Sequence, residues 1–518
     1  MHKLVRKITI VGGGTAGWLT AGVIAAEHMA NSENGVQVTL VESPDVKPIG
    51  VGEGTWPTMR GTLQKMGINE TDFFKECDAS FKQGAKFAKW VTGAENDFYY
   101  HPLVLPQGYD EINLAPYWQP QSDQVSFADA VSFQGHLCEK GLAPKQISTP
   151  EYAHVANYAY HLDAGKFAAF LQKHCTEKLG VRHVLDHVTT VNSAPNNDIS
   201  SVTTKNHGDI EGDLFIDCTG FNALLLGKHY QIPFVSKKHI LFNDTALAVH
   251  VPYQSADDAI ASHTISTGQS AGWIWDIGLP SRRGVGYVFS SAHTTIEQAE
   301  TELRDYIRPS LGQQVDDIAI RKIPIEPGHR ELFWHQNCVA VGLSAGFLEP
   351  LEASALVLVE LSAAMISEQL PANREVMDIV AKRFNDKFLY RWDRIIDFLK
   401  LHYVLTQRTD SQYWKDNCLP ESIPEGLQTL LKLWRYESPW QLDFDHADEV
   451  FPSASYQYVL YGMGFKTQAR QTAKRSDNQA LAQMTFRKNV QLTAKLLAGL
   501  PSNRELINKI HQYGLQKI

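Results

Sequence analysis

Glycines near the N-terminus have the spacing of a nucleotide-binding turn. Gly12, Gly14 and Gly17 follow the β-branched run 7–11 and precede an apolar segment that is typical of a helix. In such a turn the first glycine allows the tight bend, the second admits a pyrophosphate, and the third lets the helix pack on its strand. Glu42, 25 residues after Gly17, ends a second apolar run where an acid binds a ribose hydroxyl. The spacing predicts bound FAD or NAD and leaves the choice between them open.

A second glycine-rich segment, residues 49–57 (IGVGEGTWP), follows shortly after this acid. Positions without a Cβ, such as Gly50, let the backbone lie against a flat ring or a phosphate. The alternative is an ordinary surface loop.

The elements that must position these residues follow from the pattern of apolar positions. Runs at 36–41, 213–220 and 338–343 have the apolar character of buried parallel strands. Residues 245–289 alternate as antiparallel strands do, and apolar residues beyond 374 recur every three or four positions as in helices. The sequence therefore predicts a nucleotide-binding α/β sheet, a second sheet and a helical C-terminal region.

Composition narrows the class of protein. The chain has 518 residues, 43% of them hydrophobic, so it is long enough to bury a core without disulfides. A net charge of −9 without a basic patch argues against nucleic-acid binding. The longest apolar stretch, 338–366, is interrupted by glutamates, so no membrane span is expected. The six cysteines are scattered without a CxxC pair, which argues against a zinc site and predicts a cytoplasmic protein without a metal.

Further motifs occur in a fixed order between residues 7 and 405. They are GGGTAGW (12–18), GVGEGT (50–55), SFK (80–82), FYYHP (98–102), YHLDA (160–164), DCTGF (217–221), WIWDI (273–277) and GFLEPLE (346–352). Together they resemble the motifs of the flavin-dependent tryptophan halogenase family.

The resemblance implies a fold and a division of the chain. The expected fold class is α/β, with an FAD-binding Rossmann-like domain of the GR2 flavoprotein monooxygenase type, an antiparallel substrate sheet and a mostly helical C-terminal region. The expected FAD module consists of three interleaved segments of the chain. Two further segments form the expected substrate and tunnel sheet, and the C-terminal segment forms the helical region. These segments are 1–71, 150–235 and 330–375 for FAD, 72–149 and 236–329 for the sheet, and 376–518 for the helices.

The resemblance also implies the chemistry. Reduced FAD, oxygen and chloride or bromide would give hypohalous acid, which reaches Lys82 and then an electron-rich aromatic ring. A lysine suits this task as a hydrogen-bond donor or as a nucleophilic amine. The alternative, a solvated surface lysine, fits Lys86 and Lys89 better. Glu352 would orient the oxidant or accept the ring proton, and its alternative role is that of an acid at a helix start.

Other sites follow from the same resemblance. The backbone amides of Ser354 and Ala355 would hold the halide, because amides at a helix start suit an anion. Trp273 and Trp275, which share one face of a strand, would line the tunnel, and His101 would lie at the substrate site or be a core histidine. The FAD-binding positions are Gly12, Gly14, Thr15, Ala16, Gly17, Glu42, Gly50, Val51, Gly220, Leu343 and Leu356.

Three positions depart from the family pattern. Gly278 replaces the proline of the tryptophan motif, residues 353–355 read Ala-Ser-Ala instead of Ser-Thr-Gly, and Leu103 replaces an aromatic residue. The changes predict an altered halide loop and a wider substrate pocket. An indole or a larger electron-rich aromatic is therefore expected in preference to free tryptophan.

Two alternatives stay open at this point: a flavin monooxygenase of related fold, and a degenerate flavin-binding member. The chain shows no second glycine fingerprint for NAD(P)H. We therefore expect a separate flavin reductase as partner, together with an aromatic small-molecule substrate and a homodimer as a further possibility.

Overall fold

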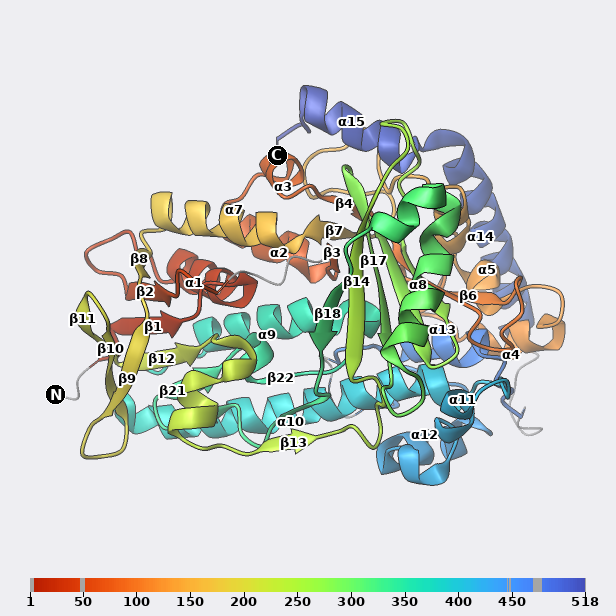
Figure 1. The fold of residues 1–518 in the computed structure, drawn as a ribbon. Coiled ribbons are helices and arrows are strands. Elements are labelled where there is room, and N and C mark those ends of the chain that lie inside the picture. The colour runs from red at the N-terminus through yellow and green to blue at the C-terminus, as the bar shows by residue number, and fades with distance from the viewer. Residues whose placement is uncertain (1–3, 47–51, 445, 447–448, 469–477, 518) are drawn as a thin grey trace. The chain divides into compact units, whose positions relative to one another are not determined.

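The computed structural model of the protein describes residues 4–46, 52–444, 446, 449–468 and 478–517 (Figure 1). The chain forms two compact units, each assembled from three separate segments. Residues 1–79, 162–237 and 326–392 form the first unit, and residues 80–161, 238–325 and 393–518 form the second. Both units combine sheets with helices, so the predicted α/β class is confirmed.

The first unit is built on a six-stranded sheet in the order β20-β21-β12-β1-β2-β8. All its neighbours are parallel except β20 and β21. Its central strands are buried along most of their length, which explains their continuous apolar runs. The strands are β1 (Lys7–Val11), β2 (Gln37–Glu42), β8 (Arg182–Leu185), β12 (Leu214–Asp217), β20 (Trp334–His335) and β21 (Cys338–Ala340).

Smaller sheets complete this unit. Three strands form an antiparallel meander, and three more form a second small sheet. The meander consists of β9 (Val188–Ser193), β10 (Ile199–Thr204) and β11 (Gly208–Glu211). The second sheet consists of β13 (Phe234–Ser236), β19 (Gly328–Arg330) and β22 (Gly346–Phe347).

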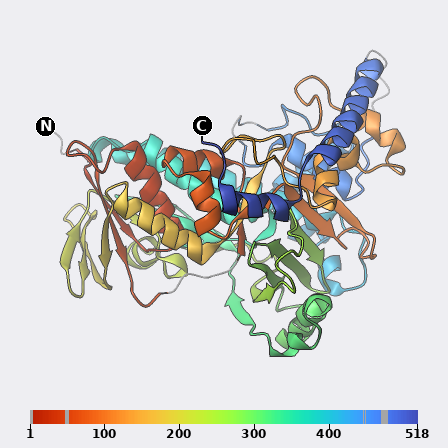
Figure 2. The ribbon, with the colours of Figure 1, turned by 90° about the horizontal axis from the view of Figure 1, so that it is seen from above.

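Helix α1 (Thr15–Glu27) packs against both α7 (Ala164–Glu177) and α9 (Ser354–Glu368), and the three helices run side by side in Figure 2. Because α1 has neighbours on several sides, its residues are apolar nearly all round, and Trp18 and Leu19 are buried. The short helices α2 (Thr58–Lys65) and α3 (Glu70–Glu76) also belong to this unit, and α2 packs on α9.

Two threonines of α2 bind a buried carboxyl group of α9. Thr62 Oγ1 donates to Glu360 Oε1 at 2.7 Å, and Thr58 Oγ1 donates to Glu360 Oε2 at 3.3 Å. Burial raises the pKa of Glu360 to about 8. The carboxyl is therefore mostly protonated at neutral pH and joins the two helices without a buried charge.

The second unit is built on a seven-stranded sheet in the order β18-β14-β17-β16-β15-β5-β6. Its pairs are antiparallel except β15 with β5, which are parallel, so the predicted antiparallel sheet is in fact mixed. The parallel pair arises because β5 and β15 come from two different segments of the chain. The strands are β5 (Gly84–Ala88), β6 (Phe98–Pro102), β14 (Thr245–Pro252), β15 (Thr264–Gly268), β16 (Gly272–Gly278), β17 (Arg282–Phe289) and β18 (Arg321–Pro324).

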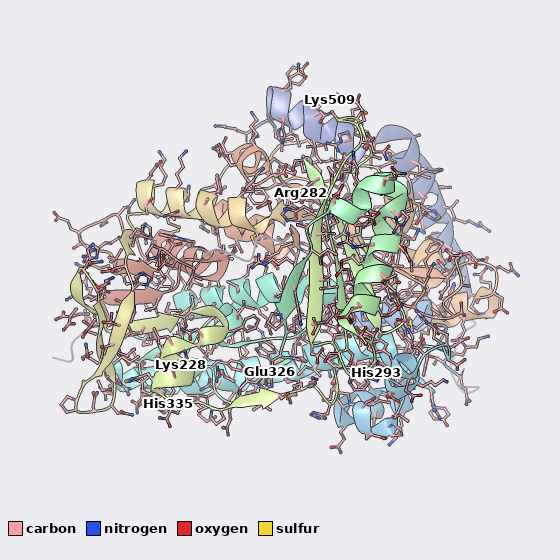
Figure 3. The ribbon with its side chains drawn as sticks, viewed as in Figure 1. Lys228, Arg282, His293, Glu326, His335 and Lys509 are labelled. Atoms are coloured by element: carbon pink, nitrogen blue, oxygen red, sulfur yellow. The ribbon has the colours of Figure 1, made fainter. Side chains whose placement is uncertain are left out.

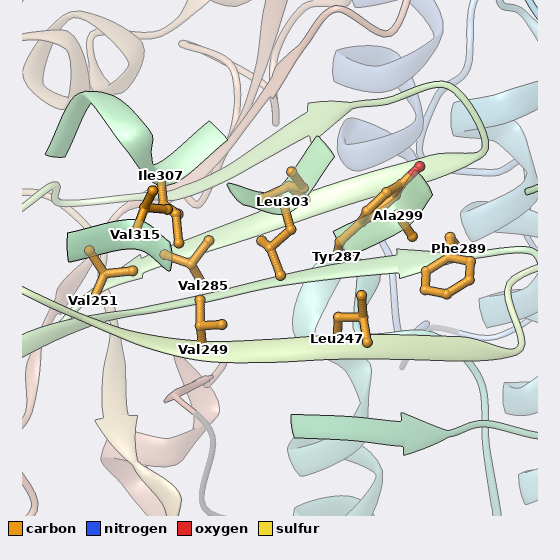
Figure 4. Packing of buried hydrophobic residues seen from close by; sticks show 11 residues of the cluster. Leu247, Val249, Val251, Val285, Tyr287, Phe289, Ala299, Leu303, Ile307 and Val315 are labelled. Carbon is orange, nitrogen blue, oxygen red and sulfur yellow. The ribbon is translucent and has the colours of Figure 1, made fainter. Parts of the chain in front are cut away.

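Helix α8 (Ile296–Leu311) covers β14 and β17, as Figure 4 shows. Leu247 and Val249 alternate along β14 and lie opposite Tyr287 and Val285 of β17. Leu303 of α8 packs in the same buried cluster. One face of this sheet therefore serves as core.

Helices follow the second sheet in the sequence. They are α10 (Arg374–Val404), α11 (Gln412–Asp416), α12 (Glu425–Trp434), α13 (Ser453–Gly462), α14 (Gln479–Gly499) and α15 (Asn503–Tyr513). This confirms the predicted helical C-terminal region, although residues up to 392 cluster with the first unit. Lys509 extends from α15 and pairs with Glu505 one turn earlier (Figure 3). Among the described helices, none has both the length and the apolarity to cross a bilayer.

The protonated state of Glu360 predicts a pH-dependent stability. Because its pKa is raised on folding from 4.5 to about 8, the stabilisation is complete below about pH 4.5 and is lost as the pH rises to about 8. We expect Glu360→Gln to raise the Tm by about 3 °C or more near pH 9, and to change it little near pH 5.

Differential scanning calorimetry across this pH range checks the effect. Glu368→Gln, at the exposed end of the same helix, is the matched control for the loss of a carboxylate. Equal Tm changes at both pH values would show that Glu360 is ionised in the fold.

Candidate active site

The glycine turn of the first unit is held by close backbone contacts. Gly12 has a φ of +115°, and a Cβ there would lie 2.1 Å from the carbonyl oxygen of Cys218. A Cβ at Gly17 would lie 1.9 Å from the carbonyl oxygen of Gly12. The turn and the packing predicted for these two glycines are therefore confirmed.

Gly14 differs from its neighbours because it faces open space. A Cβ there would meet no described atom within 4 Å. Gly14 is the N-cap of α1, and no side chain of the described residues caps the helix there. Thr15 and Ala16 begin the helix and are half-buried, so their amides lie at an uncapped positive helix end. An open backbone cradle at a helix start fits the pyrophosphate of FAD.

Glu42 ends β2 directly beside this turn. A Cβ at Gly13 would lie 2.1 Å from its Cδ, so Gly13 leaves room for the Glu42 side chain. His183 Nε2 lies 2.9 Å from Glu42 Oε2. Burial raises the pKa of the Glu42 carboxyl, and His183 acts in the opposite direction. The acid predicted to bind a ribose hydroxyl thus lies beside the glycine turn, and His183 is a neighbour that the sequence did not indicate.

The other predicted FAD positions come from separate segments of the chain, which contact one another in the first unit. Gly220 has a φ of +67° and also faces open space. Leu343 lies in a short turn after β21, and Leu356 lies in the first turn of α9. Gly50 and Val51 lie outside the described residues.

The lysine segment forms β4 (Ser80–Lys82) in the second unit. Lys82 is 3% exposed, whereas Lys86 and Lys89 are partly exposed and form ion pairs with Glu139 and Glu95. Lys82 is therefore the buried lysine of the three, as the motif predicts, and a solvated surface role does not fit it.

His161 faces the same side of the sheet as Lys82. In the antiparallel pair of β4 with β7 (Ala159–Asp163), His161 lies opposite Ser80, and Ala159 lies opposite Lys82. Side chains two positions apart share a face, so His161 and Lys82 are diagonal neighbours. His161 Nε2 lies 2.8 Å from Thr264 Oγ1. The motif at 160–164 contained this histidine, but only the strand register relates it to the lysine.

Burial, and then the charge of Lys82, hold the pKa of His161 well below its ordinary value. Burial also lowers the pKa of the adjacent His263 to about 4. Both rings are therefore uncharged at neutral pH. The surroundings of Lys82 on this face are polar but carry no second positive charge from these histidines.

The two tryptophans of β16 lie on one face, as predicted. Trp273 and Trp275 are buried, with ring centroids 6.5 Å apart and planes at 65°. On the neighbouring strand, a Cβ at Gly286 would lie 2.1 Å from Trp275 Cζ2. Gly286 therefore makes room for the indole. Gly278, which replaces the family's proline, ends β16 and accepts a hydrogen bond from Ser80 Oγ at 2.5 Å.

His101 of β6 is 6% exposed, and its Nε2 lies 2.9 Å from Ser455 Oγ. Its ring also contacts Phe398 and Tyr458. A hydrogen-bonded, aromatic-packed ring agrees with the alternative of a core histidine.

Glu352 lies in the first unit, immediately before α9. Its φ is +61° and that of Ala353 is +56°, so two residues with a Cβ adopt left-handed backbone in succession. Ser354 is buried, Ala355 is exposed, and no side chain of the described residues caps α9 at Ala353. An acid followed by an uncapped helix start is thus present as predicted, with amides that suit a halide.

Glu53, in β3 (Gly52–Gly54), is a titratable group that sequence reasoning did not single out. Burial, and to a lesser extent the charge of Asp163, raise its pKa to about 7. A carboxyl poised near neutral pH in the second glycine-rich segment is a candidate for proton transfer. Among the described residues, no group of three or more His, Cys, Asp or Glu could hold a metal ion.

Comparison with known proteins identifies the family. A family model described as tryptophan halogenase matches residues 7–478. The solved tryptophan halogenase of Shewanella frigidimarina NCIMB 400 is 51% identical, with a TM-score of 0.96 and coverage of 100% of this chain and 99% of that one. BrvH, a flavin-dependent halogenase from Brevundimonas sp. BAL3, is 31% identical, with a TM-score of 0.86 and coverage of 98% and 99%.

A curated relative supports the same assignment. Tryptophan 6-halogenase SttH of Streptomyces toxytricini is 33% identical over 479 residues, which are 88% of this chain and 89% of that protein. The chain therefore belongs to the tryptophan halogenase family and is a flavin-dependent halogenase. The resemblance seen in the sequence is confirmed.

The open space above Gly14 yields a test that separates binding from folding. Because a Cβ at Gly14 meets no described atom, Gly14→Ala should leave the Tm unchanged. If the pyrophosphate lies there, the same methyl group should weaken FAD binding by about tenfold or more. Fluorescence titration with FAD measures the affinity.

Gly61→Ala is the matched control, since its Cβ also meets no described atom. It should leave the FAD affinity unchanged and should raise the Tm slightly, because alanine is the better residue inside helix α2. Unchanged FAD affinity in Gly14→Ala would place the pyrophosphate elsewhere.

Proposed function

We propose that the enzyme halogenates an electron-rich aromatic ring of indole type, with Lys82 and Glu352 as its catalytic residues. The observation that carries the proposal is the nearly complete burial of Lys82, at 3% exposure, within the motif shared with the family. Keeping a lysine out of water costs free energy, so a buried lysine at such a position favours a chemical role.

The first unit has the features of an FAD site. The turn around Gly14 and the acid Glu42 fit the pyrophosphate and a ribose of FAD. When bound, reduced FAD would supply two electrons and two protons. With these and one further proton, oxygen and a halide ion give hypohalous acid and water. The amides of Ser354 and Ala355 would hold chloride or bromide.

Lys82 would act on the hypohalous acid. As an ammonium, its Nζ donates hydrogen bonds to the oxygen and polarises the halogen toward the ring. As a free amine, it takes up the halogen and releases water, which leaves a haloamine. His161 beside it adds no second positive charge, because burial and the charge of Lys82 hold its pKa well below the ordinary value.

Glu352 would accept the proton that the ring loses once the carbon–halogen bond has formed. A positioned carboxylate contributes about 10²- to 10⁴-fold in such a transfer. The uncapped start of α9 stabilises its negative charge.

The proposed substrate class rests on the named activity of a relative and on one difference from the family's sequence pattern, at Leu103. SttH is named a tryptophan 6-halogenase, so an indole is a reasonable target for this chain. Leu103 in place of an aromatic residue favours an indole derivative, or a larger aromatic, over free tryptophan.

We also propose that a separate flavin reductase supplies FADH2 and that the enzyme forms a homodimer. A cytoplasmic location is proposed as well, because the six cysteines are all unpaired.

The test is a mass-spectrometric assay with FAD, a flavin reductase, NADH, oxygen and a panel of indoles and phenols. The wild type should form products that gain halogen only when chloride or bromide is present. Oxygenated products that do not depend on halide would instead identify a monooxygenase.

Variants assign the roles in the same assay. Lys82→Ala and Glu352→Gln should lower product formation by about 10²-fold or more while FAD binding stays unchanged. Lys86→Ala, which removes a partly exposed lysine four residues away, is the control and should retain activity. Full activity in Lys82→Ala would refute the proposed role.

A further inference from the structure

The indole of Trp56 is hydrogen-bonded to the backbone of Glu352. Trp56 Nε1 donates to the carbonyl oxygen of Glu352 at 2.8 Å, across 296 residues of sequence. Both residues belong to the first unit. The contact therefore joins the second glycine-rich segment to the segment that carries the proposed catalytic carboxylate.

The peptide that Trp56 binds is held at both of its polar ends. Its carbonyl, from Glu352, accepts from the indole, and its N–H, from Ala353, donates to the carbonyl oxygen of Pro350 at 3.1 Å. The plane of this peptide sets ψ of Glu352 and φ of Ala353. Two opposed hydrogen bonds thus fix its orientation.

This peptide needs such support because its backbone is unfavourable. Glu352 (φ +61°, ψ 8°) and Ala353 (φ +56°, ψ 40°) are both left-handed, and neither is a glycine. Residues with a Cβ keep this conformation only where their surroundings enforce it, and such strain is concentrated at functional sites.

Trp56 is itself anchored. It lies two residues before α2, and α2 is joined to α9 through the hydrogen bonds of Thr58 and Thr62 with Glu360. Because these contacts fix both helices, the indole meets the Glu352 carbonyl from a defined direction.

We propose that Trp56 is a positioning residue that holds Glu352 in its left-handed conformation, and thereby orients the carboxylate and the first amides of α9. The inference rests on the proposed function, because it assumes that Glu352 is catalytic. Trp56 acts through Glu352 and not on the reacting atoms.

Removing the donor while keeping the ring tests this role. In the full-length protein, Trp56 is replaced by phenylalanine (Trp56→Phe) or, by amber suppression, by 3-benzothienylalanine, which has sulfur in place of the N–H. We expect kcat for halogenation to fall about tenfold or more in both, since small displacements of a catalytic group have large effects. The KM for the aromatic substrate and the FAD affinity should stay within about twofold.

Two further measurements separate positioning from folding. Crystal structures of the variants should show residue 352 outside the left-handed region, while the Tm changes little. Trp118→Phe is the matched control, because Trp118 Nε1 also donates to a backbone carbonyl, that of Val125, at 2.8 Å. It should leave kcat unchanged.

The outcomes are distinct. A benzothienylalanine protein with wild-type kcat and an unchanged residue 352 would overturn the inference, even if Trp56→Phe failed to fold. If Glu352→Gln were also fully active, the proposed function would fail as well. A drop in kcat in Trp56→Phe that the benzothienylalanine protein does not share would assign the effect to ring shape, against the inference.

Discussion

The first unit depends on the close backbone approach at the end of β1. Here Gly12 touches the carbonyl of Cys218, Gly17 touches the carbonyl of Gly12, and Gly13 lies against the Glu42 side chain. Any Cβ at these positions would overlap a neighbour by more than 1 Å relative to ordinary contact. The absence of a Cβ at these three glycines therefore allows the ends of β1, β2 and β12 to meet the start of α1. The uncapped helix start and the acid are therefore presented together.

Local sequence was sufficient to predict this part of the molecule. A strand, a glycine turn, a helix and an acid at the end of the next strand are all encoded within about 40 residues. The apolar runs at 213–220 and 338–343 predicted β12 and β21 for the same reason, since a strand buried on both faces can be recognised without its partner. The parallel pairing of β5 with β15 was missed because strand order depends on contacts that the local pattern does not contain.

The contacts around the candidate site were harder to predict. His161 stood in a recognised motif, but its place beside Lys82 depends on the register of β4 with β7, and a shift by one residue would turn it to the other face. Trp56 and Glu352 are separated by 296 residues, and an indole donor leaves no periodic signal. The role of Thr62 likewise depends on Glu360, a partner far along the chain. The role of Gly286 follows only from the strand register that places it opposite Trp275.

Several residues in the candidate site occupy environments or backbone conformations that are unfavourable for folding, and a chemical role explains them. Lys82 is a buried lysine, Glu352 and Ala353 are strained without being glycine, and Glu53 is a carboxyl whose pKa burial raises to about 7. Each lowers the free energy of unfolding relative to a simpler residue at the same place. Such departures persist where they serve chemistry. Lys82, Glu352 and Glu53 fall within the motifs that resemble those of the family, whereas the buried carboxyl of Glu360 accepts hydrogen bonds from two threonines and serves packing.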